Sequence, residues 1–416
     1  MAKPSTQERL WVWLDNPAFG PCQHIGTLSK GDRDSVRFAY ASAWLRNPSA
    51  FELDPALTLG EGEFYPAESN FGVFMDSCPD RWGQMLMRRR ELIEAKETNR
   101  APRTLTAWDF LQGVQDFTRM GALRFSRPDS QHFIADEMRA APPVAKLAEL
   151  QAVALELTRK NLDDFPKLKQ WLKVLVAPGA SLGGARPKAN LMGEDNALWI
   201  AKFPAADDER DLALWEKLLH DLARDCGIEV PPARVERVGH GYHTFIAKRF
   251  DREGLRRRFF TSAMALLGKT DQQEASYLEL AEFIASFGSP EHLQDDLRQL
   301  FTRVIFNVAT GNRDDHLRNH GFLRTPTGWR LAPAYDMNAS TKKADHELAL
   351  DFDSRVPRLA TVLATAAFYR LTNAEAQATV ERVVAKLNEW RTRARAIGIP
   401  AVELAEVEHV FVTHVV

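Results

Sequence analysis

Short runs of alternating apolar and polar residues dominate the first third of the chain and predict strands. The predicted strands are residues 10–14, 35–40 and 120–125. Between them, the apolar spacing of Trp82, Leu86 and Leu92 predicts a helix, with Ser77 or Asp80 as its N-cap. This region is therefore expected to form a mixed α/β module.

The middle of the chain begins with a polar stretch at residues 131–143, rich in alanine and proline, which is a candidate domain boundary. Helices are then predicted at residues 144–160 and 165–176, and glycine-punctuated strands at residues 181–192, 197–203 and 242–250. A strongly amphipathic segment at residues 208–226 predicts a helix, and Gly227 follows it where a C-terminal cap favours glycine.

Helical spacing dominates the last part of the chain, at residues 276–287, 290–310 and 373–397. The exception is residues 320–333, which read as two short strands joined by the turn sequence TPTG. A strand-rich module followed by a helical one with an embedded hairpin predicts an α+β, two-lobed fold of the protein-kinase type, with a mixed α/β N-terminal region and a mainly helical C-terminal lobe. Many α+β proteins share this layout, so it does not define a function.

Composition narrows the class of protein. The 416 residues carry a net charge of -2, which gives no overall basic field for nucleic acid. Cys22, Cys78 and Cys226 are far apart and in no metal-ligand spacing, so free thiols are expected. The first residues lack the apolar core of a signal peptide, and no apolar run approaches the ~20 residues of a membrane span. A cytoplasmic protein without a membrane partner is the expectation.

Candidate chemistry is concentrated in the segment FNVATGNRDDHLRNHGF. Asp314 and Asn319 have the D-x-x-x-x-N spacing of a kinase catalytic loop, and Asp336 follows the predicted hairpin. Phosphoryl transfer from ATP needs a carboxylate that accepts the hydroxyl proton and oxygen ligands for Mg²⁺. Asp314 is the candidate base and Asn319 and Asp336 are the candidate metal ligands. Asp315 remains a rival to Asp314, because adjacent side chains in a loop cannot be oriented from sequence.

His316 belongs to the same loop and is kept among the residues expected to line the nucleotide site, although a structural histidine that hydrogen-bonds the backbone is the favoured interpretation.

Two further features fit a phosphate site. Gly183 and Gly184 allow backbone N–H groups to face phosphate oxygens, and Lys188 follows them, but no Walker motif is present. Lys202 lies in an apolar strand, where a lysine is costly unless it is paired. Glu216, beside the apolar stripe of the next helix, is its expected partner, and a solvated helix edge is the competing account.

These motifs together resemble the HipA-type serine/threonine kinases. The family signature G-N-x-D-x-H-x-[KR]-N is matched from Gly311 to Asn319, and L-A-P-x-Y-D from Leu331 to Asp336. Residues 181–191 are similar to the family's glycine-rich loop, while DSCPDRWG at 76–83 and GALRF at 121–125 resemble its N-terminal module. Arg318 stands where lysine is commoner.

The resemblance implies an enzyme that uses ATP and Mg²⁺, with Asp314 as base and with Asn319 and Asp336 on the metal. It implies that Lys188 and Lys202 contact phosphates. It also implies that the strand containing Lys248 forms the hinge, with Phe250 against adenine, and that Ser181 is autophosphorylated. The implied domains are an N-terminal module (residues 1–130), a kinase N-lobe (131–255) and a helical C-lobe (256–416).

The implied partners are a HipB-like helix-turn-helix antitoxin, DNA contacted only through that antitoxin, and a protein substrate such as an aminoacyl-tRNA synthetase. Two alternatives stay open at this point. One is a small-molecule phosphotransferase of related fold, and the other is an inactive corepressor bound to an antitoxin.

Overall fold

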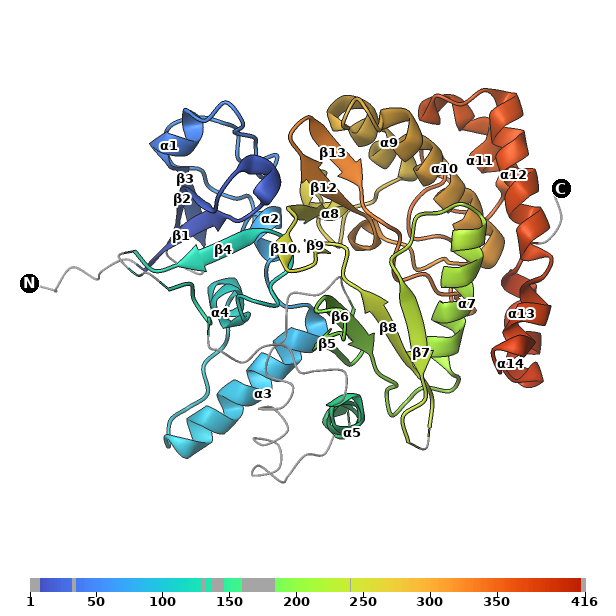
Figure 1. Ribbon diagram of the computed structural model, residues 1–416, viewed down its shortest axis with the longest axis horizontal. Coiled ribbons are helices and arrows are strands. Elements are labelled where there is room, and N and C mark those ends of the chain that lie inside the picture. The colour runs from blue at the N-terminus through green and yellow to red at the C-terminus, as the bar shows by residue number, and fades with distance from the viewer. Residues whose placement is uncertain are drawn as a thin grey trace, which may run out of the picture. The chain divides into compact units, whose positions relative to one another are not determined.

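The computed structural model describes residues 8–31, 35–128, 130, 132–136, 146–158, 184–239 and 241–412. The chain divides into two compact units, whose elements are labelled in Figure 1. The first unit comprises Met1–Ile200 and Asp251–Lys269, and the second comprises Ala201–Phe250 and Thr270–Val416.

An antiparallel sheet with the strand order β3-β2-β1-β4 forms the N-terminal part of the first unit. Its strands are β1 (Arg9–Leu14), β2 (Gln23–Lys30), β3 (Val36–Tyr40) and β4 (Leu123–Ser126). Every second residue of β1 is buried, which explains why its pattern is visible in the sequence. Buried and exposed residues do not alternate along β2, so this strand was not predicted from the sequence. Gly26 of β2 is required by packing, since a Cβ there would lie 2.2 Å from Phe38 Cζ.

Helices of the first unit follow in the chain order α1 (Ser42–Leu45), α2 (Gly72–Met75), α3 (Arg81–Glu97), α4 (Ala107–Gly113) and α5 (Leu147–Thr158). A 3₁₀ turn, η1, covers Pro17–Phe19. Asp80 caps α3 by accepting a hydrogen bond from Gly83 N at 2.9 Å, so of the two predicted caps it is Asp80 that serves. The helix predicted at residues 165–176 lies outside the described residues.

Two strands and a return segment complete the first unit. The strands are β5 (Lys188–Met192) and β6 (Leu198–Lys202), and the last two residues of β6 belong to the second unit. The return segment contains β9 (Arg252–Glu253), β10 (Arg256–Arg257), β11 (Phe260–Ser262) and α8 (Ala263–Leu266). Asp76 accepts hydrogen bonds from Ser262 N (2.7 Å) and Oγ (2.8 Å), which ties this segment to the N-terminal module.

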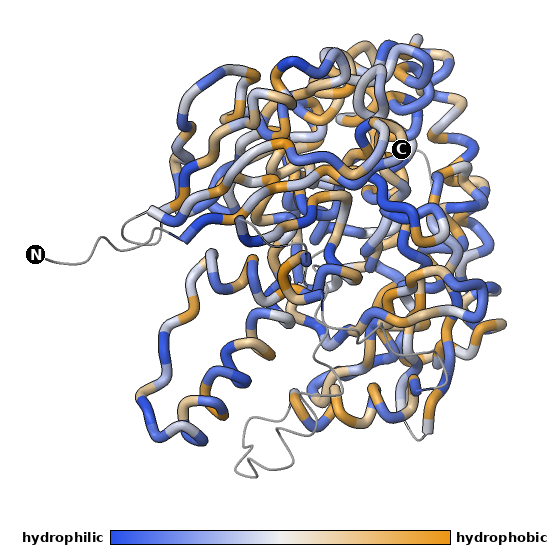
Figure 2. The backbone as a smooth tube through the Cα atoms, turned by 60° about the vertical axis from the view of Figure 1, so that its left-hand side comes forward, coloured by the Kyte–Doolittle hydropathy of each residue, from blue (hydrophilic) through white to orange (hydrophobic). Residues whose placement is uncertain are grey.

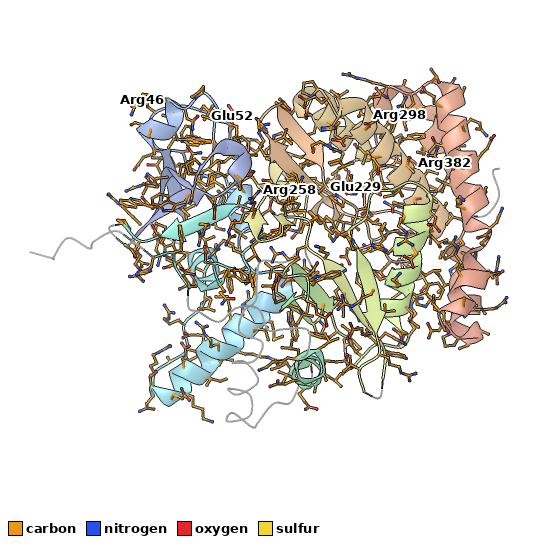
Figure 3. The ribbon with its side chains drawn as sticks, viewed as in Figure 1. Arg46, Glu52, Glu229, Arg258, Arg298 and Arg382 are labelled. Carbon is orange, nitrogen blue, oxygen red and sulfur yellow. The ribbon has the colours of Figure 1, made fainter. Side chains whose placement is uncertain are left out.

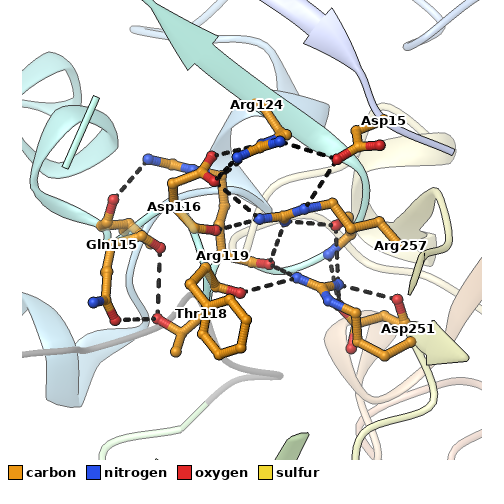
Figure 4. A network of polar contacts seen from close by, with 12 residues as sticks. Asp15, Gln115, Asp116, Thr118, Arg119, Arg124, Asp251 and Arg257 are labelled. Carbon is orange, nitrogen blue, oxygen red and sulfur yellow. Dashed lines mark hydrogen bonds and ion pairs between the residues drawn. The ribbon is translucent and has the colours of Figure 1, made fainter. Parts of the chain in front are cut away.

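A buried network of arginines and aspartates links the two parts of the first unit (Figure 4). Asp116 is 1% exposed and accepts from Arg124 Nε at 3.0 Å and from Arg257 Nη2 at 3.3 Å. Arg119 donates to the carbonyls of Ser77, Leu111 and Val114. Burial lowers the pKa of Arg119 to about 10, so it stays charged at neutral pH. Because every charge here has partners, the network holds separate chain segments together without leaving an unpaired buried ion.

The second unit is organised around α10 (Leu293–Thr310), which is buried along most of its length. It contacts α7 (Leu212–Asp225), α9 (Tyr277–Phe287), α11 (Leu359–Ala364), η4 (Ala366–Tyr369) and α12 (Asn373–Leu387). Arg298 of α10, labelled in Figure 3, donates to Glu375 of α12 at 3.0 Å. The predicted cap of α7 is present, since Gly227 follows Cys226 with φ +83°.

Strands of the second unit form two antiparallel pairs. β7 (Ala233–Glu236) pairs with β8 (Thr244–Lys248), and β12 (Gly321–Thr325) pairs with β13 (Gly328–Leu331). The second pair is the hairpin that the turn sequence TPTG predicts.

The predicted helix at residues 373–397 is wrong as one element, because it ends with α12 and restarts as α13 (Trp390–Ala396). The break at Asn388 and Glu389 accompanies the full burial of Trp390, which stacks on Phe411. The chain then forms α14 (Ala401–Val407) and η5 (Glu408–Val410).

Hydropathy changes over short distances along the backbone, as the mixed colours of Figure 2 show. In the part of the chain that the structure describes, no helix combines the length and the apolar character needed to cross a bilayer. The three cysteines are free thiols, as predicted.

Replacing Asp116 tests the buried network. We expect Asp116→Ala to lower the free energy of unfolding by about 3–5 kcal/mol, because Arg124 and Arg257 lose their buried carboxylate and keep only the more exposed Asp15. Urea unfolding followed by tryptophan fluorescence measures the change. Glu94→Ala is the control, since its pair with Arg90 lies on an exposed helix surface and is expected to contribute less than about 1 kcal/mol. Equal losses in the two variants would contradict this account.

Candidate active site

The candidate catalytic loop begins where α10 ends. Gly311 caps the helix in the left-handed conformation (φ +66°), and a Cβ at this position would lie 2.6 Å from Val410 Cβ. Asn312 then donates from Nδ2 to Asn307 Oδ1 at 3.0 Å, which fixes the chain as it leaves the helix. Glycine is therefore required for both conformation and packing at the point where the loop starts.

Asp314 and Asp315 have opposite environments. Asp315 is 3% exposed and accepts hydrogen bonds from Tyr277 Oη (2.6 Å) and Asn307 Nδ2 (2.8 Å), while His320 Nε2 lies 2.7 Å from its Oδ2. Burial alone would raise the pKa of Asp315, but His320 and Tyr277 outweigh it and hold the pKa below its ordinary value. The Asp314 side chain is 63% exposed and forms an ion pair with Lys343. Of the two carboxylates, Asp314 is the one that a substrate can reach.

Asn319, at the end of η3 (Leu317–Asn319), has an unused oxygen. Its backbone N donates to His316 O at 2.8 Å and its Nδ2 donates to Asp314 O at 3.4 Å. Its Oδ1 is buried and has no hydrogen-bond partner among the described residues. A buried amide oxygen without a partner is costly, and a bound cation would satisfy it. The orientation of Asn319 is thus compatible with the predicted role as a metal ligand.

Lys202, at the end of β6, is shared by two carboxylates. Its Nζ lies 2.6 Å from Glu216 Oε1 on α7 and 2.6 Å from Asp336 Oδ1 after β13. The contact with Glu216 is the one expected from the sequence. Burial alone would lower the pKa of Lys202, but Asp336 and Glu216 outweigh it and raise the pKa above its ordinary value. Lys202 is therefore held as a cation beside Asp336.

Asp336 itself has φ +58°, a conformation that residues other than glycine rarely adopt. Such strain persists only where surrounding contacts impose it, and it is concentrated at functional sites. The segment after Asp336 is bonded to the catalytic loop, since Asn338 N donates to Asn312 Oδ1 (3.4 Å) and Ser340 N to Gly311 O (2.9 Å). The side chain of Asp336 is thereby held by Lys202, and the residues that follow it are held by the candidate catalytic loop.

The predicted hinge residues lie in the second unit as well. Lys248 ends β8, and its backbone N donates to Pro232 O at 2.8 Å. Phe250 is buried and stacks on Tyr335 with ring centroids 5.5 Å apart. His316 has a buried Nδ1 without a hydrogen-bond partner within the described residues. The roles of these three residues toward a nucleotide stay predictions.

The candidate phosphate loop lies in the first unit, and Ser181 and Gly183 fall outside the described residues. Gly184 has φ +94°, and its carbonyl accepts from Lys188 Nζ at 3.3 Å. Lys188 is buried, and its Nζ lies 2.6 Å from Asp80, the cap of α3. Trp82 Nε1 also donates to Lys188 O at 3.1 Å. Lys188, which is predicted to contact phosphate, is held by Asp80 of the DSCPDRWG motif. This pairing was not predicted.

Several partners of the candidate residues were not predicted. In the second unit, Tyr277, Asn307 and His320 surround Asp315, and Lys343 contacts Asp314. In the first unit, Asp80 holds Lys188. Among the described residues there is no group of three His, Cys, Asp or Glu side chains that could hold a metal ion. Mg²⁺ does not require such a cage, because it is commonly held by one or two protein oxygens together with phosphates and water.

Two protein-family models match this chain. The model of the HipA-like C-terminal domain matches residues 180–391, and the model of the HipA N-terminal domain matches residues 12–126. The chain belongs to the HipA family. The first match includes Lys188, Lys202 and the whole catalytic loop, and the second includes DSCPDRWG.

Two curated relatives are similar to part of this chain. The serine/threonine-protein kinase toxin HipA of Shewanella oneidensis is 27% identical over 206 residues, which cover 42% of this chain and 46% of that protein. A protein of Haemophilus influenzae is 29% identical over 181 residues, covering 38% of this chain and 52% of that protein. The chain thus spans about half the length of these curated relatives.

The fold also agrees. The structure of Shewanella oneidensis HipA in complex with HipB and operator DNA superposes with a TM-score of 0.66 at 17% identity, over 96% of this chain and 94% of that one. The predicted α+β, two-lobed HipA-like fold is confirmed.

Removing the hydroxyl of Tyr277 tests how the candidate catalytic loop is supported. We expect Tyr277→Phe to lower the free energy of unfolding by about 1.5–3 kcal/mol, because Asp315 loses a hydrogen bond to its charged carboxylate. Urea unfolding provides the measurement. Tyr65→Phe is the matched control, since Tyr65 is exposed, and it is expected to change stability by less than about 0.5 kcal/mol. A Tyr277→Phe variant as stable as the control would contradict this role.

His346 is expected to make stability depend on pH. The side chain is 2% exposed, neither ring nitrogen has a partner among the described residues, and burial lowers its pKa from 6.5 to about 4. The unfolded chain therefore binds the proton more readily. The contribution of His346 is complete above about pH 6.5 and is lost as pH falls to about 4, up to about 3 kcal/mol. Unfolding free energies measured from pH 7.5 to 4 should fall less steeply in His346→Leu. The exposed His409→Leu control should keep the wild-type slope, and an unchanged slope in both variants would refute the assignment.

Proposed function

We propose that the protein is a serine/threonine protein kinase that transfers the γ-phosphoryl group of ATP to a protein hydroxyl with the help of Mg²⁺. The observation that carries the proposal is the position of Lys202 between Glu216 and Asp336. A lysine paired with a helix glutamate and placed beside a metal-binding aspartate is the arrangement that protein kinases use on ATP phosphates. Membership of the HipA family supports the same reaction class.

We propose the following role for each residue. The exposed carboxylate of Asp314 accepts the proton of the attacking hydroxyl. Asn319 Oδ1 and Asp336 would hold Mg²⁺, which would supply positive charge to the phosphates. Lys202 would contact phosphate oxygens while Glu216 fixes its direction. In the same proposal Gly183, Gly184 and Lys188 would contact phosphates, the hinge at Lys248 and Phe250 would hold adenine, and His316 would line the site.

The wider biological role is part of the proposal. The Shewanella oneidensis relative is a kinase toxin, and the superposed structure is a complex of HipA, HipB and operator DNA. We infer that this chain acts as a growth-inhibiting toxin that a HipB-like helix-turn-helix antitoxin binds, with DNA contacted only through that antitoxin. A component of translation, such as an aminoacyl-tRNA synthetase, is the proposed substrate. Autophosphorylation of Ser181 would add negative charge to the phosphate loop and would oppose nucleotide binding.

Two aspartate variants test the reaction. Purified protein is incubated with labelled ATP and Mg²⁺, and transfer to protein is measured with and without a chelator. We expect Asp314→Asn and Asp336→Asn each to reduce transfer by ~10²-fold or more, because each removes a group that acts as part of one unit. Asp353→Asn, an exposed aspartate, is the control and should retain wild-type activity.

The location of the label separates the proposal from its main alternative. Label on a peptide containing Ser181 supports a protein kinase. If label never reaches protein but does reach small hydroxyl compounds, the enzyme is a small-molecule phosphotransferase. Wild-type activity in both aspartate variants would refute the mechanism.

A further inference from the structure

Arg318 is a basic residue of the candidate catalytic loop, but its side chain is bonded away from Asp314. Arg318 Nε lies 3.0 Å from Asp271 Oδ1, and its Nη2 lies 3.1 Å from Asp271 Oδ2. This two-point geometry matches the planar guanidinium to a carboxylate. The carbonyl of Arg318 also accepts from Tyr335 Oη at 2.7 Å. Arg318 therefore fastens the loop to Asp271.

The cation beside Asp314 comes instead from the segment after Asp336. Lys343 Nζ forms an ion pair with Asp314 Oδ1 and a second one with Glu347 Oε2 at 2.7 Å. Burial alone would lower the pKa of Lys343, but hydrogen bonds to Asp314 and Glu347 raise it, so the ammonium is charged at neutral pH. One cation thus lies directly at the carboxylate that the proposed function assigns as base.

The backbone around Lys343 is fixed to the catalytic loop at both ends. Ser340 N donates to Gly311 O (2.9 Å) and Glu347 N donates to Arg313 O (3.0 Å). Between these points Arg313 Nη1 donates to Lys343 O at 2.7 Å. The position of Lys343 next to Asp314 is therefore imposed by three bonds to the loop and does not depend on its side chain alone.

Resting on the proposed function, we propose that Lys343 is the cation that binds the phosphoryl group during transfer. In the reaction the bond between the γ-phosphorus and the β,γ-bridging oxygen breaks, and a bond from γ-phosphorus to the substrate hydroxyl oxygen forms. The hydroxyl proton goes to Asp314, and ADP leaves with the electron pair of the broken bond. Lys343 neither gives nor takes a proton in this step.

Charge explains why such a cation is needed. The phosphoryl oxygens carry negative charge, and they must approach the carboxylate of Asp314, which also carries negative charge. The Lys343 stem is flexible, so its ammonium can leave Asp314 for a phosphoryl oxygen while Glu347 keeps it close. Positive charge held at a transferring phosphoryl group stabilises the transition state, and removing one stabilising group of this kind typically costs ~10²–10³-fold in rate.

Autophosphorylation kinetics with labelled ATP and Mg²⁺ test this inference, alongside the Kd of a fluorescent ADP analogue. We expect Lys343→Met to lower the rate at saturating ATP by ~10²-fold. Its Kd for the ADP analogue should remain within about threefold of wild type, because ADP lacks the phosphoryl group that Lys343 binds. Lys343→Arg keeps the charge and should recover part of the rate.

A matched variant completes the experiment. Lys342→Met removes an exposed neighbouring lysine and should stay within about threefold of the wild-type rate. A Lys343→Met rate equal to wild type, or a loss matched by weaker binding of the ADP analogue, would overturn the role of Lys343. A wild-type protein that transfers no phosphate would overturn the proposed function as well.

Discussion

One ammonium group, Lys202 Nζ, constrains how three elements of the second unit are arranged. It joins the end of β6, the face of α7 and the residue that follows the β12–β13 hairpin. A buried lysine needs negative charge around it, so each of these elements must approach closely enough to supply or receive it. The left-handed backbone of Asp336 follows from this requirement, since the aspartate must reach Lys202 while the next residues return to the catalytic loop.

The candidate catalytic loop is held by a separate set of contacts around Asp315. Asp315 is enclosed by a tyrosine, an asparagine and a histidine, so the adjacent Asp314 is directed toward solvent. Two neighbouring carboxylates thereby have different surroundings, since Asp315 is buried and hydrogen-bonded and Asp314 is exposed. In the first unit, residues of the DSCPDRWG motif hold three separate segments. Asp76 accepts a hydrogen bond from Ser262, the Ser77 carbonyl accepts one from Arg119, and Asp80 pairs with Lys188.

Local sequence signals predicted what depends on local spacing. The interval between Asp314 and Asn319, the turn before Gly328 and the cap at Gly227 are short-range features, and the elements around them were found. Two of the missed contacts could not be found in this way, because Lys188 and Asp80 are 108 positions apart and Tyr277 and Asp315 are 38 apart. The break between α12 and α13 was missed for a similar reason, since it accompanies the packing of Trp390 against Phe411, a contact without a periodic signal.

The contact between Gly311 and Val410 has a consequence for synthesis. Val410 covers the left-handed turn from which the catalytic loop leaves α10, and Val412 N donates to Ala309 O at 2.8 Å in the same place. The ribosome adds Val410 and Val412 about a hundred residues after Gly311. A nascent chain that has emerged only as far as α13 therefore lacks the residues that close the helix end, and the loop can reach this conformation only after Val410 and Val412 have been added.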